Sequence, residues 1–294
     1  MSPTIEKLNL TCKGEIFCTM YLLAFESSCD DTSVALLKDG ELISMHTHTQ
    51  AEHIKTMGVV PEVAARLHAD HIFELITQVL KDAEIMLENI DIFAATSEPG
   101  LVPSLLIGKT VAKTLAISHK KPLIWVNHIE GHIFSLLLER KIEELAFPMI
   151  VLSASGGHND LFLWKSLFEI ERIGHTVDDS AGESMDKVGR SLGLPFPAGR
   201  YIDELAQKYN PDIHKNIPQF PLVLPEETLN FSFSGLKSSA LREIEIREKH
   251  HGKLTETDLI EISYGYQKTI VTILSERLIE ARKKLGTKSM ALVG

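Results

Sequence analysis

One pattern occurs twice in this chain and restricts the folds that are open to it. Residues 21–38 consist of an apolar run, a short polar turn and a second apolar run, which together predict two strands joined by a turn. Residues 148–165 follow the same plan, although the two stretches share few identical residues. In both, the turn is made of small and polar residues. The repeat predicts a duplicated unit that begins with a hairpin.

Strand and helix patterns alternate between the two hairpins. Asp39-Gly40 is a favoured hairpin turn, so a third strand is predicted over 41–49. Pro61 suits a first helical position and precedes apolar residues at helical spacing, namely Val63, Ala64, Leu67, Ile72, Leu75, Ile76, Val79 and Leu80. Further strands are predicted within 91–100 and 121–127, and further helices over 104–118 and 128–140.

This order of elements defines the predicted fold class. Two copies of such a unit, each led by a hairpin, are typical of an α/β protein with two ribonuclease-H-like domains. Actin, sugar kinases and the Hsp70 ATPase have this architecture. In them the two hairpin turns face each other across an interdomain cleft and hold phosphates with backbone N–H groups. By this analogy, the turns here are candidates for the same task.

Composition limits the classes of function. The chain has 294 residues and a formal net charge of −10, which argues against a broadly basic surface for nucleic acid. Its three cysteines form no CxxC pair and are too few for a disulfide framework, so a reducing compartment is expected. No apolar run approaches the roughly 18 residues of a membrane span. We therefore expect a cytoplasmic protein that contacts no membrane.

Two histidines, His128 and His132, lie four positions apart within residues 126–135. On a helix such residues lie one above the other, so both imidazoles can reach one ion. Imidazole suits zinc and iron, and at least one further ligand would come from elsewhere. Glu130 is rotated from the histidine face by about 200° and is badly placed as the base of a metallopeptidase. Two unrelated surface histidines explain the pair equally well.

Acidic side chains are concentrated in the stretch "TVDDSAGESMDKVGRSLG". A capped helix explains most of them, with Asp178 or Asp179 at the N-cap, Glu183 in the first turn and Gly193 near the end. Asp186 lies further inside this helix, and the turn after the helix returns the chain toward it. Its carboxylate could accept hydrogen bonds from a ribose.

Two other motifs have structural explanations. Residues 103–110 end like a phosphate-binding P-loop, but Pro103 replaces the first glycine and the segment has the apolar face of a helix. We predict no phosphate site there. Residues 230–239 predict a strand end followed by a helix that a serine caps, with Lys237 either structural or in contact with a phosphate.

Seven stretches, taken in order, resemble one family closely, the universal tRNA N6-adenosine threonylcarbamoyltransferases, formerly described as O-sialoglycoprotein endopeptidases. They are "ESSCDDTSVAL", "GVVPEVAARLHADHI", "PGLVPSLLIGKTVAKTLA", "NHIEGHIFS", "SGGHNDLFL", "DDSAGESMDKVGRSLGLPFPAG" and "NFSFSGLKSSA". The resemblance implies two actin-like domains, which we expect over 20–127 and 128–294, after a tail of residues 1–19.

The resemblance also implies a reaction and its components. Such an enzyme transfers the threonylcarbamoyl group of threonylcarbamoyl-AMP to the exocyclic amine of adenosine 37 in tRNAs that read ANN codons, and AMP leaves. One divalent ion, iron or zinc, would be bound by His128, His132 and an aspartate near the C-terminus. A degenerate paralogue and a small ATPase would be partner proteins.

The same resemblance places the substrate contacts on this sequence. The substrate-binding turn falls on Ser153, Ala154, Ser155, Gly156 and Gly157, and further nucleotide contacts fall on Asp186, Gly199 and Asp203. No activated side-chain nucleophile is needed, because a cationic metal polarises the carbonyl and stabilises charge on its oxygen.

The sequence departs from the family pattern at its end and at several internal positions, including Thr56-Met57 and Asn159. It stops at "MALVG", where the family continues into a glycine turn and the aspartate ligand, so the first domain is expected to lack its closing elements and the second to be incomplete. Glu98 stands where glycine is usual. Ala198 and Arg200 stand in the usual PGGP turn, where they would alter the ribose pocket.

Three alternatives to the transferase stay open. The first is a truncated, non-catalytic scaffold, and the second is a sugar-kinase-like phosphotransferase that uses ATP. The third is a metallopeptidase, which is the weakest because Glu130 does not follow the first histidine directly, as the glutamate of the HExxH motif does.

Overall fold

The structure is a computed structural model that describes residues 19–53, 58–138, 140–222 and 228–294. The chain divides into two compact units. The first comprises Met1–Gln50 and Pro61–His128, and the second comprises Ala51–Val60 and Ile129–Gly294. The two units are described separately below.

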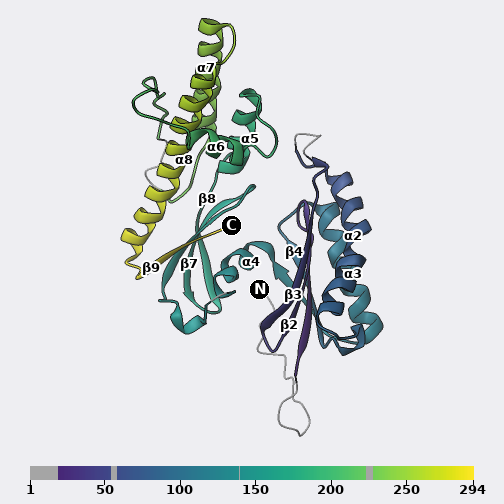
Figure 1. The fold of residues 1–294 in the computed structure, drawn as a ribbon. Helices are drawn as coiled ribbons and strands as arrows, with labels where there is room; N and C mark the ends of the chain where they lie inside the picture. Colours follow the sequence, from purple (N-terminus) through teal and green to yellow (C-terminus); the bar gives the residue numbers. More distant parts are fainter. Residues whose placement is uncertain (1–18, 54–57, 139, 223–227) are drawn as a thin grey trace. The chain divides into compact units, whose positions relative to one another are not determined.

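The first unit is built on a five-stranded sheet (Figure 1). Its strands are β1 (Tyr21–Glu26), β2 (Asp31–Lys38), β3 (Glu41–Thr49), β4 (Ile92–Glu98) and β5 (Leu123–Asn127), in the order β3-β2-β1-β4-β5. The first three strands pair antiparallel, and β4 and β5 pair parallel. Asp39 and Gly40, with φ of 53° and 87°, form the tight turn between β2 and β3. The predicted hairpin and third strand are confirmed.

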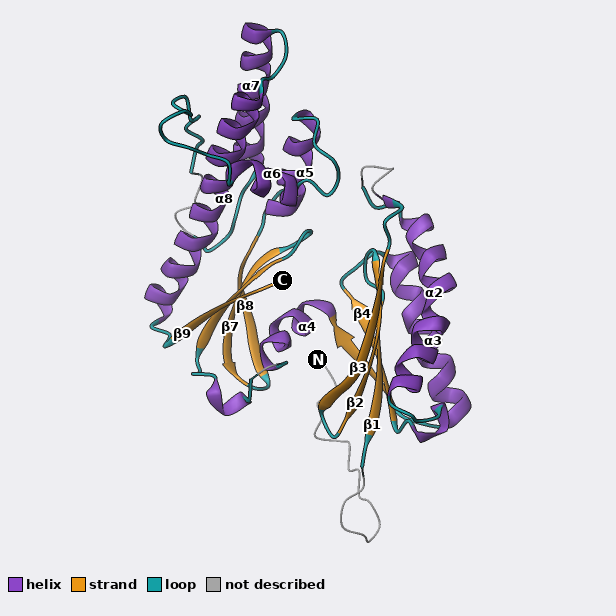
Figure 2. Cartoon of the chain, in the orientation of Figure 1, coloured by secondary structure: helices purple, strands orange, loops and turns teal. Residues whose placement is uncertain are grey.

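Two long helices, α2 (Pro61–Asp82) and α3 (Val102–His119), cover one face of this sheet (Figure 2). Their apolar residues, such as Ile72 of α2, form one core with strand residues such as Phe25 of β1 and Phe93 of β4. The start of α2 at Pro61 is confirmed. Val63, predicted on its apolar face, is instead exposed. A short 3-10 helix, η2 (Leu87–Asn89), precedes β4.

The second unit has a four-stranded sheet of the same plan. Its strands are β6 (Met149–Ala154), β7 (Asn159–Ser166), β8 (Glu169–His175) and β9 (Ser289–Val293), in the order β8-β7-β6-β9. The first three again pair antiparallel, and β9 pairs parallel with β6. Each sheet therefore places a later parallel strand beside the first strand of an antiparallel meander.

Helices pack on both faces of the second sheet. One core joins β6 and β7 to α5 (Ala181–Ser191), α6 (Gly199–Ala206), α7 (Ser234–His251) and α8 (Glu256–Leu285). A separate cluster contains Ile129 and Ile133 of α4 (His128–Phe134), with Trp164 of β7 and Val293 of β9. The two clusters use opposite faces of the strands, since their side chains alternate along β6.

The helix predicted over 128–140 is shorter in the structure. The α-helix ends at Phe134, and two 3-10 helices follow, η3 (Ser135–Leu137) and η4 (Ile142–Glu144). The hydroxyl of Ser135 donates to the carbonyl oxygen of His132 over 2.7 Å. Serine side chains that bond to nearby carbonyl groups in this way compete with the regular helical ladder. This competition is a physical reason for the early end.

The predicted α/β class is confirmed, with two sheets of repeated topology. The predicted domain limits, the cleft and the incomplete end stay predictions, and the expected tail lies outside the described residues apart from Thr19. None of the described helices combines the length and the apolarity that crossing a membrane would demand.

Candidate functional site

The turn between β1 and β2 in the first unit is fixed by contacts with α3. Ser27 Oγ donates to the carbonyl oxygen of Ser104 over 2.9 Å, and Leu101 N donates to the carbonyl oxygen of Ser28 over 2.7 Å. A β-carbon at Gly100 would lie 2.7 Å from that same carbonyl oxygen of Ser28. Only a residue without a side chain allows this approach, so the turn is held in one position.

A polar cluster forms where β1 ends at Glu26. Its Oε1 accepts from Ser28 N over 2.5 Å, and its Oε2 accepts from Thr96 Oγ1 over 2.5 Å. Oε2 also lies 3.1 Å from Nδ1 of His128, and Ser28 Oγ lies 3.2 Å from the same nitrogen. Burial alone would raise the pKa of Glu26, but the hydrogen bonds with His128, Ser28 and Thr96 outweigh it and lower the pKa to about 2. The carboxylate is therefore ionised at neutral pH.

The two predicted metal ligands both lie on α4, at the first and fifth residues of the helix. His128 and His132 are half-buried, while Glu130 is exposed. Ile129 and Ile133 are buried on the adjacent stripe of the helix, about 100° away, so packing fixes the rotation of α4 about its axis. The described residues include no group of three or more histidine, cysteine, aspartate or glutamate side chains placed to hold a metal ion.

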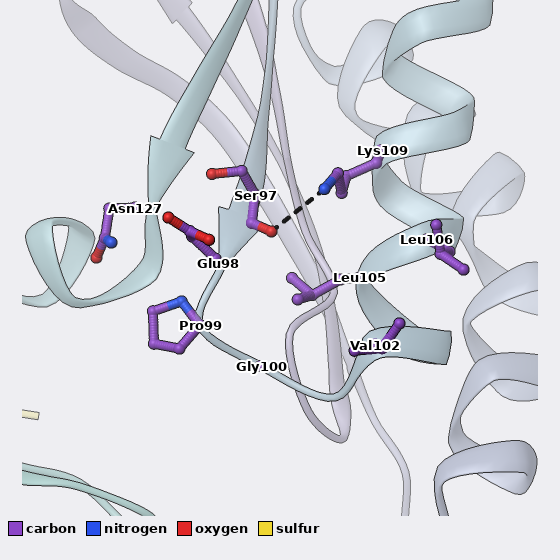
Figure 3. A pocket seen from close by; sticks show the side chains of 9 residues that line it. All are labelled: Ser97, Glu98, Pro99, Gly100, Val102, Leu105, Leu106, Lys109 and Asn127. Atoms are coloured by element: carbon purple, nitrogen blue, oxygen red, sulfur yellow. Dashed lines mark hydrogen bonds between the residues drawn. The ribbon is translucent and has the colours of Figure 1, made fainter. Parts of the chain in front are cut away.

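A surface hollow of about 490 Å³ lies in the first unit beside the end of β4 (Figure 3). Glu98, Pro99 and Asn127 line one side, and Val102, Leu105 and Leu106 of α3 line another. Lys109 Nζ donates to the carbonyl oxygen of Ser97 over 3.4 Å and lies 5.5 Å from the centre of the Trp125 ring. The P-loop-like residues 103–110 are thus helical, as predicted, and Glu98 contributes its carboxylate to the rim of a hollow.

The second candidate site is the turn that joins β6 to β7. Ser153 and Ala154 end β6, and Ser155, Gly156 and Gly157 form the turn, which Ser155 N closes by donating to the carbonyl oxygen of His158 over 3.0 Å. Gly156 and Gly157 are exposed. Ser153 Oγ is buried and makes no hydrogen bond within the described part of the chain.

Helix α5 begins against this turn. Ser180 is its N-cap: Ser180 Oγ accepts from Glu183 N over 3.1 Å and donates to the carbonyl oxygen of Gly156 over 2.7 Å. A β-carbon at Gly182 would lie 2.6 Å from that carbonyl oxygen. The predicted N-cap at Asp178 or Asp179 is wrong, because Ser180 follows directly and has the capping geometry. Glu183 completes the capping box in the first turn, and Gly193 follows the helix with φ of 74°.

Asp178 instead caps a different helix. Its Oδ1 accepts from Phe233 N over 2.8 Å and from Ser234 N over 3.3 Å, where α7 begins. The hydroxyl groups of Ser232 and Ser234 both donate to Oδ2. The prediction that a serine caps this helix is therefore wrong, because Asp178, distant in the sequence, accepts from its first N–H groups.

Asp179 and Lys237 form an ion pair, and Lys187 donates to the other oxygen of Asp179 over 2.5 Å. Burial alone would raise the pKa of Asp179, but Lys187 and Lys237 lower it. Of the two explanations for Lys237, these contacts favour the structural one.

The predicted nucleotide contacts Asp186, Gly199 and Asp203 lie on the neighbouring helices α5 and α6. Asp186 Oδ1 accepts from Ala198 N over 2.7 Å, directly before Gly199, the first residue of α6. Burial raises the pKa of Asp186, and the hydrogen bond with Ala198 only partly offsets it. Asp203 accepts from Gln207 Nε2 and from Gln267 Nε2, each over 2.6 Å. The chain thus returns toward Asp186 after α5, as the sequence suggested.

Within the second unit, the turn and the start of α5 lie in direct contact, and Asp186 links α5 to the start of α6. Sequence reasoning missed Glu26, which holds the ring of His128 in the first unit. The available signal was an acidic residue at the end of the otherwise apolar strand "YLLAFE", directly before a turn of small polar residues.

Comparison with known proteins identifies the family. The family model described as tRNA N6-adenosine threonylcarbamoyltransferase matches residues 41–294, which is most of the chain. The chain belongs to this family. A tRNA N6-adenosine threonylcarbamoyltransferase of Bacillus subtilis is 40% identical over 277 residues, which cover 94% of this chain and 77% of that protein. The protein of that name from Staphylococcus haemolyticus is 42% identical and is covered to 78%, with 93% of this chain. The expected membership in a family of transferases is confirmed.

Solved structures are more distant. Component A of (R)-2-hydroxyglutaryl-CoA dehydratase from Acidaminococcus fermentans is 13% identical, with a TM-score of 0.47 over 92% of this chain and 91% of that one. YeaZ from Pseudomonas aeruginosa is 20% identical, with a TM-score of 0.37 over 52% of this chain and 64% of that one. Likeness at this level carries no information on function.

Proposed function

We propose that this protein transfers the threonylcarbamoyl group of threonylcarbamoyl-AMP to the N6 amine of adenosine 37 in tRNAs that read ANN codons. The single observation that supports this most strongly is the family match over residues 41–294. In the reaction the amine attacks the carbonyl carbon, a C–N bond forms, the bond to the phosphate oxygen of AMP breaks, and the amine loses a proton. An anticodon-loop base is single-stranded and can be splayed out for such a reaction.

The β6–β7 turn is the proposed site for the AMP part of the donor. Gly156 and Gly157 are exposed, so their backbone can approach a ligand closely. Helix α5 starts against the turn, and the partial positive charge at a helix N-terminus favours a phosphate. Ser153, Ala154 and Ser155 form the rest of this segment. The Ser153 hydroxyl is buried and makes no hydrogen bond within the described residues, which supports a role for it in binding the donor.

We assign the binding of the ribose to two carboxylates of the second unit, Asp186 and Asp203. Asp186 uses Oδ1 to hold the backbone of Ala198, which leaves Oδ2 as an acceptor for a sugar hydroxyl. Gly199 follows at the start of α6, and Asp203 lies one helical turn further along. Ala198 is buried, and its small side chain packs at Gly189 of α5, so this departure from the family pattern is accommodated by the helix pair.

His128 and His132 are the proposed ligands of one divalent ion, iron or zinc. Two imidazoles one helical turn apart supply two nitrogen ligands of the kind such an ion takes, and a carboxylate lies beside Nδ1 of the first. At least one further ligand must come from elsewhere, because the described residues hold no group of three such side chains. When bound, the metal would polarise the carbonyl oxygen of the donor and stabilise charge on it. The side chains of α4 would orient that group, since Ile129 and Ile133 fix the rotation of the helix.

Partner proteins are part of this proposal. The family resemblance implies a degenerate paralogue and a small ATPase, and the net charge of −10 gives this chain little general attraction for tRNA. We propose that partners supply part of the tRNA surface.

The test is an assay of the purified chain with its partner proteins, threonylcarbamoyl-AMP and an unmodified tRNA that reads ANN codons. Modified nucleoside is measured by mass spectrometry and bound metal by elemental analysis. The double variant His128→Ala, His132→Ala should lose both bound metal and product. The matched control is His175→Ala with His250→Ala, which removes two exposed histidines outside α4 and should change neither.

The proposal fails if the unsubstituted protein forms no product in the complete mixture. If the His128/His132 variant forms as much product as the unsubstituted protein, the assigned metal ligands are refuted and the family assignment stays intact.

A further inference from the structure

The geometry points to Glu26 as a positioning residue for the metal site of the proposed function, on which this inference rests. We infer that Glu26 fixes the imidazole of His128 in the tautomer that carries its proton on Nδ1. The lone pair of the neutral ring then lies on Nε2, the nitrogen that would bind the ion. The inference concerns a side chain 102 positions away from the histidine, to which the family resemblance gave no role.

The tautomer follows from hydrogen-bond chemistry. Glu26 Oε2 lies 3.1 Å from His128 Nδ1, a distance at which a carboxylate oxygen accepts a hydrogen bond from a ring N–H. This contact therefore favours the tautomer that carries its hydrogen on Nδ1. A neutral imidazole has only one N–H, so Nε2 is the acceptor nitrogen of the same ring.

Two further donors hold the carboxylate itself. Thr96 Oγ1 donates to Oε2 over 2.5 Å, and Ser28 N donates to Oε1 over 2.5 Å. Ser28 in turn is held by Leu101 N, which donates to its carbonyl oxygen, and by the close approach of Gly100. Because β1, β4 and the turn after β1 all contribute, Glu26 cannot turn away from His128 without breaking contacts in several elements.

Metal-binding histidines usually donate their second ring N–H to a carboxylate or carbonyl group, which fixes the ring and makes the ligand nitrogen more basic. Glu26 and His128 have this arrangement. Glu130, the acidic residue nearest in sequence, is exposed and rotated about 200° from the histidine face, so it is badly placed for the task.

The first test measures affinity for Zn²⁺ alone, by competition with a chromophoric chelator, in the full chain. Glu26→Ala should weaken Zn²⁺ binding about 10–100-fold. Glu26→Gln should weaken it less, because the amide oxygen still accepts from Nδ1. Circular dichroism and thermal unfolding of each variant show whether it is folded.

The matched control is Asp82→Asn. Asp82 Oδ2 lies 2.6 Å from His46 Nε2 at the α2–β3 edge, so this variant alters another carboxylate–histidine contact in the same unit. It should leave the Zn²⁺ affinity unchanged. An equal loss of affinity in Asp82→Asn and Glu26→Ala would overturn the inference, because a general loss of stability would then explain both.

The second test needs no metal. Ring ¹⁵N chemical shifts of His128 in the metal-free protein should report the Nδ1–H tautomer, and Glu26→Ala should shift the ring toward the Nε2–H form that free imidazole side chains favour. An Nε2–H tautomer in the unsubstituted protein would overturn the inference.

The outcomes separate this inference from the proposed function. Zn²⁺ affinity that is lost in His128→Ala but unchanged in Glu26→Ala would refute the role of Glu26 and leave the metal ligands intact. Failure of the unsubstituted protein to bind Zn²⁺ would refute a zinc site at His128 and with it the role of Glu26, whereas the transferase activity is tested separately by product formation.

Discussion

A β-carbon at Gly182 would lie 2.6 Å from the carbonyl oxygen of Gly156, so the first turn of α5 and the β6–β7 turn are in backbone contact. A real β-carbon does not come so close to a backbone oxygen, so a side chain at this position would force one of the two segments to shift. The glycine at position 182 is therefore a requirement of this packing.

Gly182→Ala should lower the free energy of unfolding by about 1–3 kcal/mol, which is typical of overpacking. Chemical denaturation monitored by circular dichroism measures the change. Gly131→Ala is the matched control, because Gly131 is also helical but a β-carbon there meets no atom within 4 Å. The control should be neutral or stabilising, since alanine is the better helix former. Equal destabilisation by the two would contradict the packing argument.

Ser180→Ala should cost about 1 kcal/mol of stability, because it removes the N-cap of α5. It also removes the hydrogen bond to Gly156, so the KM for threonylcarbamoyl-AMP should rise. Thr255→Ala removes the N-cap of α8, which has the same capping box but does not contact the turn. The stability of the Thr255→Ala variant should fall by a similar amount, with no change in the KM for threonylcarbamoyl-AMP. A rise in KM for both variants would mean that the effect comes from stability alone.

Asp186 should contribute less to the stability of the folded state at neutral pH than at acid pH. Burial raises its pKa in the folded protein, so the folded state holds this proton more tightly than the unfolded chain. Its contribution to stability is therefore most favourable at low pH and falls as pH rises through the folded pKa. Asp186→Asn keeps an acceptor for Ala198 N and should be at least as stable as the unsubstituted protein at pH 7. Urea denaturation at pH 4 and pH 7 tests this, and a less stable Asn variant at pH 7 would refute it.

Arg247 should have a large effect on stability. It is 8% exposed and donates to Asp258 over 3.0 Å and to Glu261 over 2.7 Å, and these carboxylates are 3% and 2% exposed. Arg247→Met leaves both charges without their main partner, which should cost about 3–5 kcal/mol. Arg242→Met on the same helix replaces an exposed side chain and serves as the control. A loss below about 1 kcal/mol in Arg247→Met would show that the cluster is not a net source of stability.

The pH dependence of this cluster has the opposite sign to that of Asp186. Burial alone would raise the pKa of Asp258, but hydrogen bonds from Thr255, His251 and Arg247 outweigh it and lower the pKa. Its stabilisation is complete above the ordinary pKa of an aspartate and is lost as pH falls toward the folded value. Acid should therefore destabilise the unsubstituted protein more than the Arg247→Met variant.

The sequence predicted local patterns more reliably than long-range contacts. Both hairpins and α2 followed from apolar periodicity and turn residues, because those signals lie within one element. The N-cap of α5 was misplaced by one or two residues, since Asp178, Asp179 and Ser180 are all good capping residues and only the backbone geometry chooses between them. The contact between Glu26 and His128 could not be predicted by any local rule, because it depends on how β1, β4 and β5 pair.

The cap that Asp178 provides to α7 has a consequence for local opening. The first amides of most helices exchange quickly with solvent, because they fray without disturbing the rest of the fold. Here the amide hydrogens of Phe233 and Ser234 are held by a carboxylate in the segment that leads into α5. They should exchange with deuterium only when that segment opens as well, so the two places form one cooperative unit despite more than 50 intervening residues.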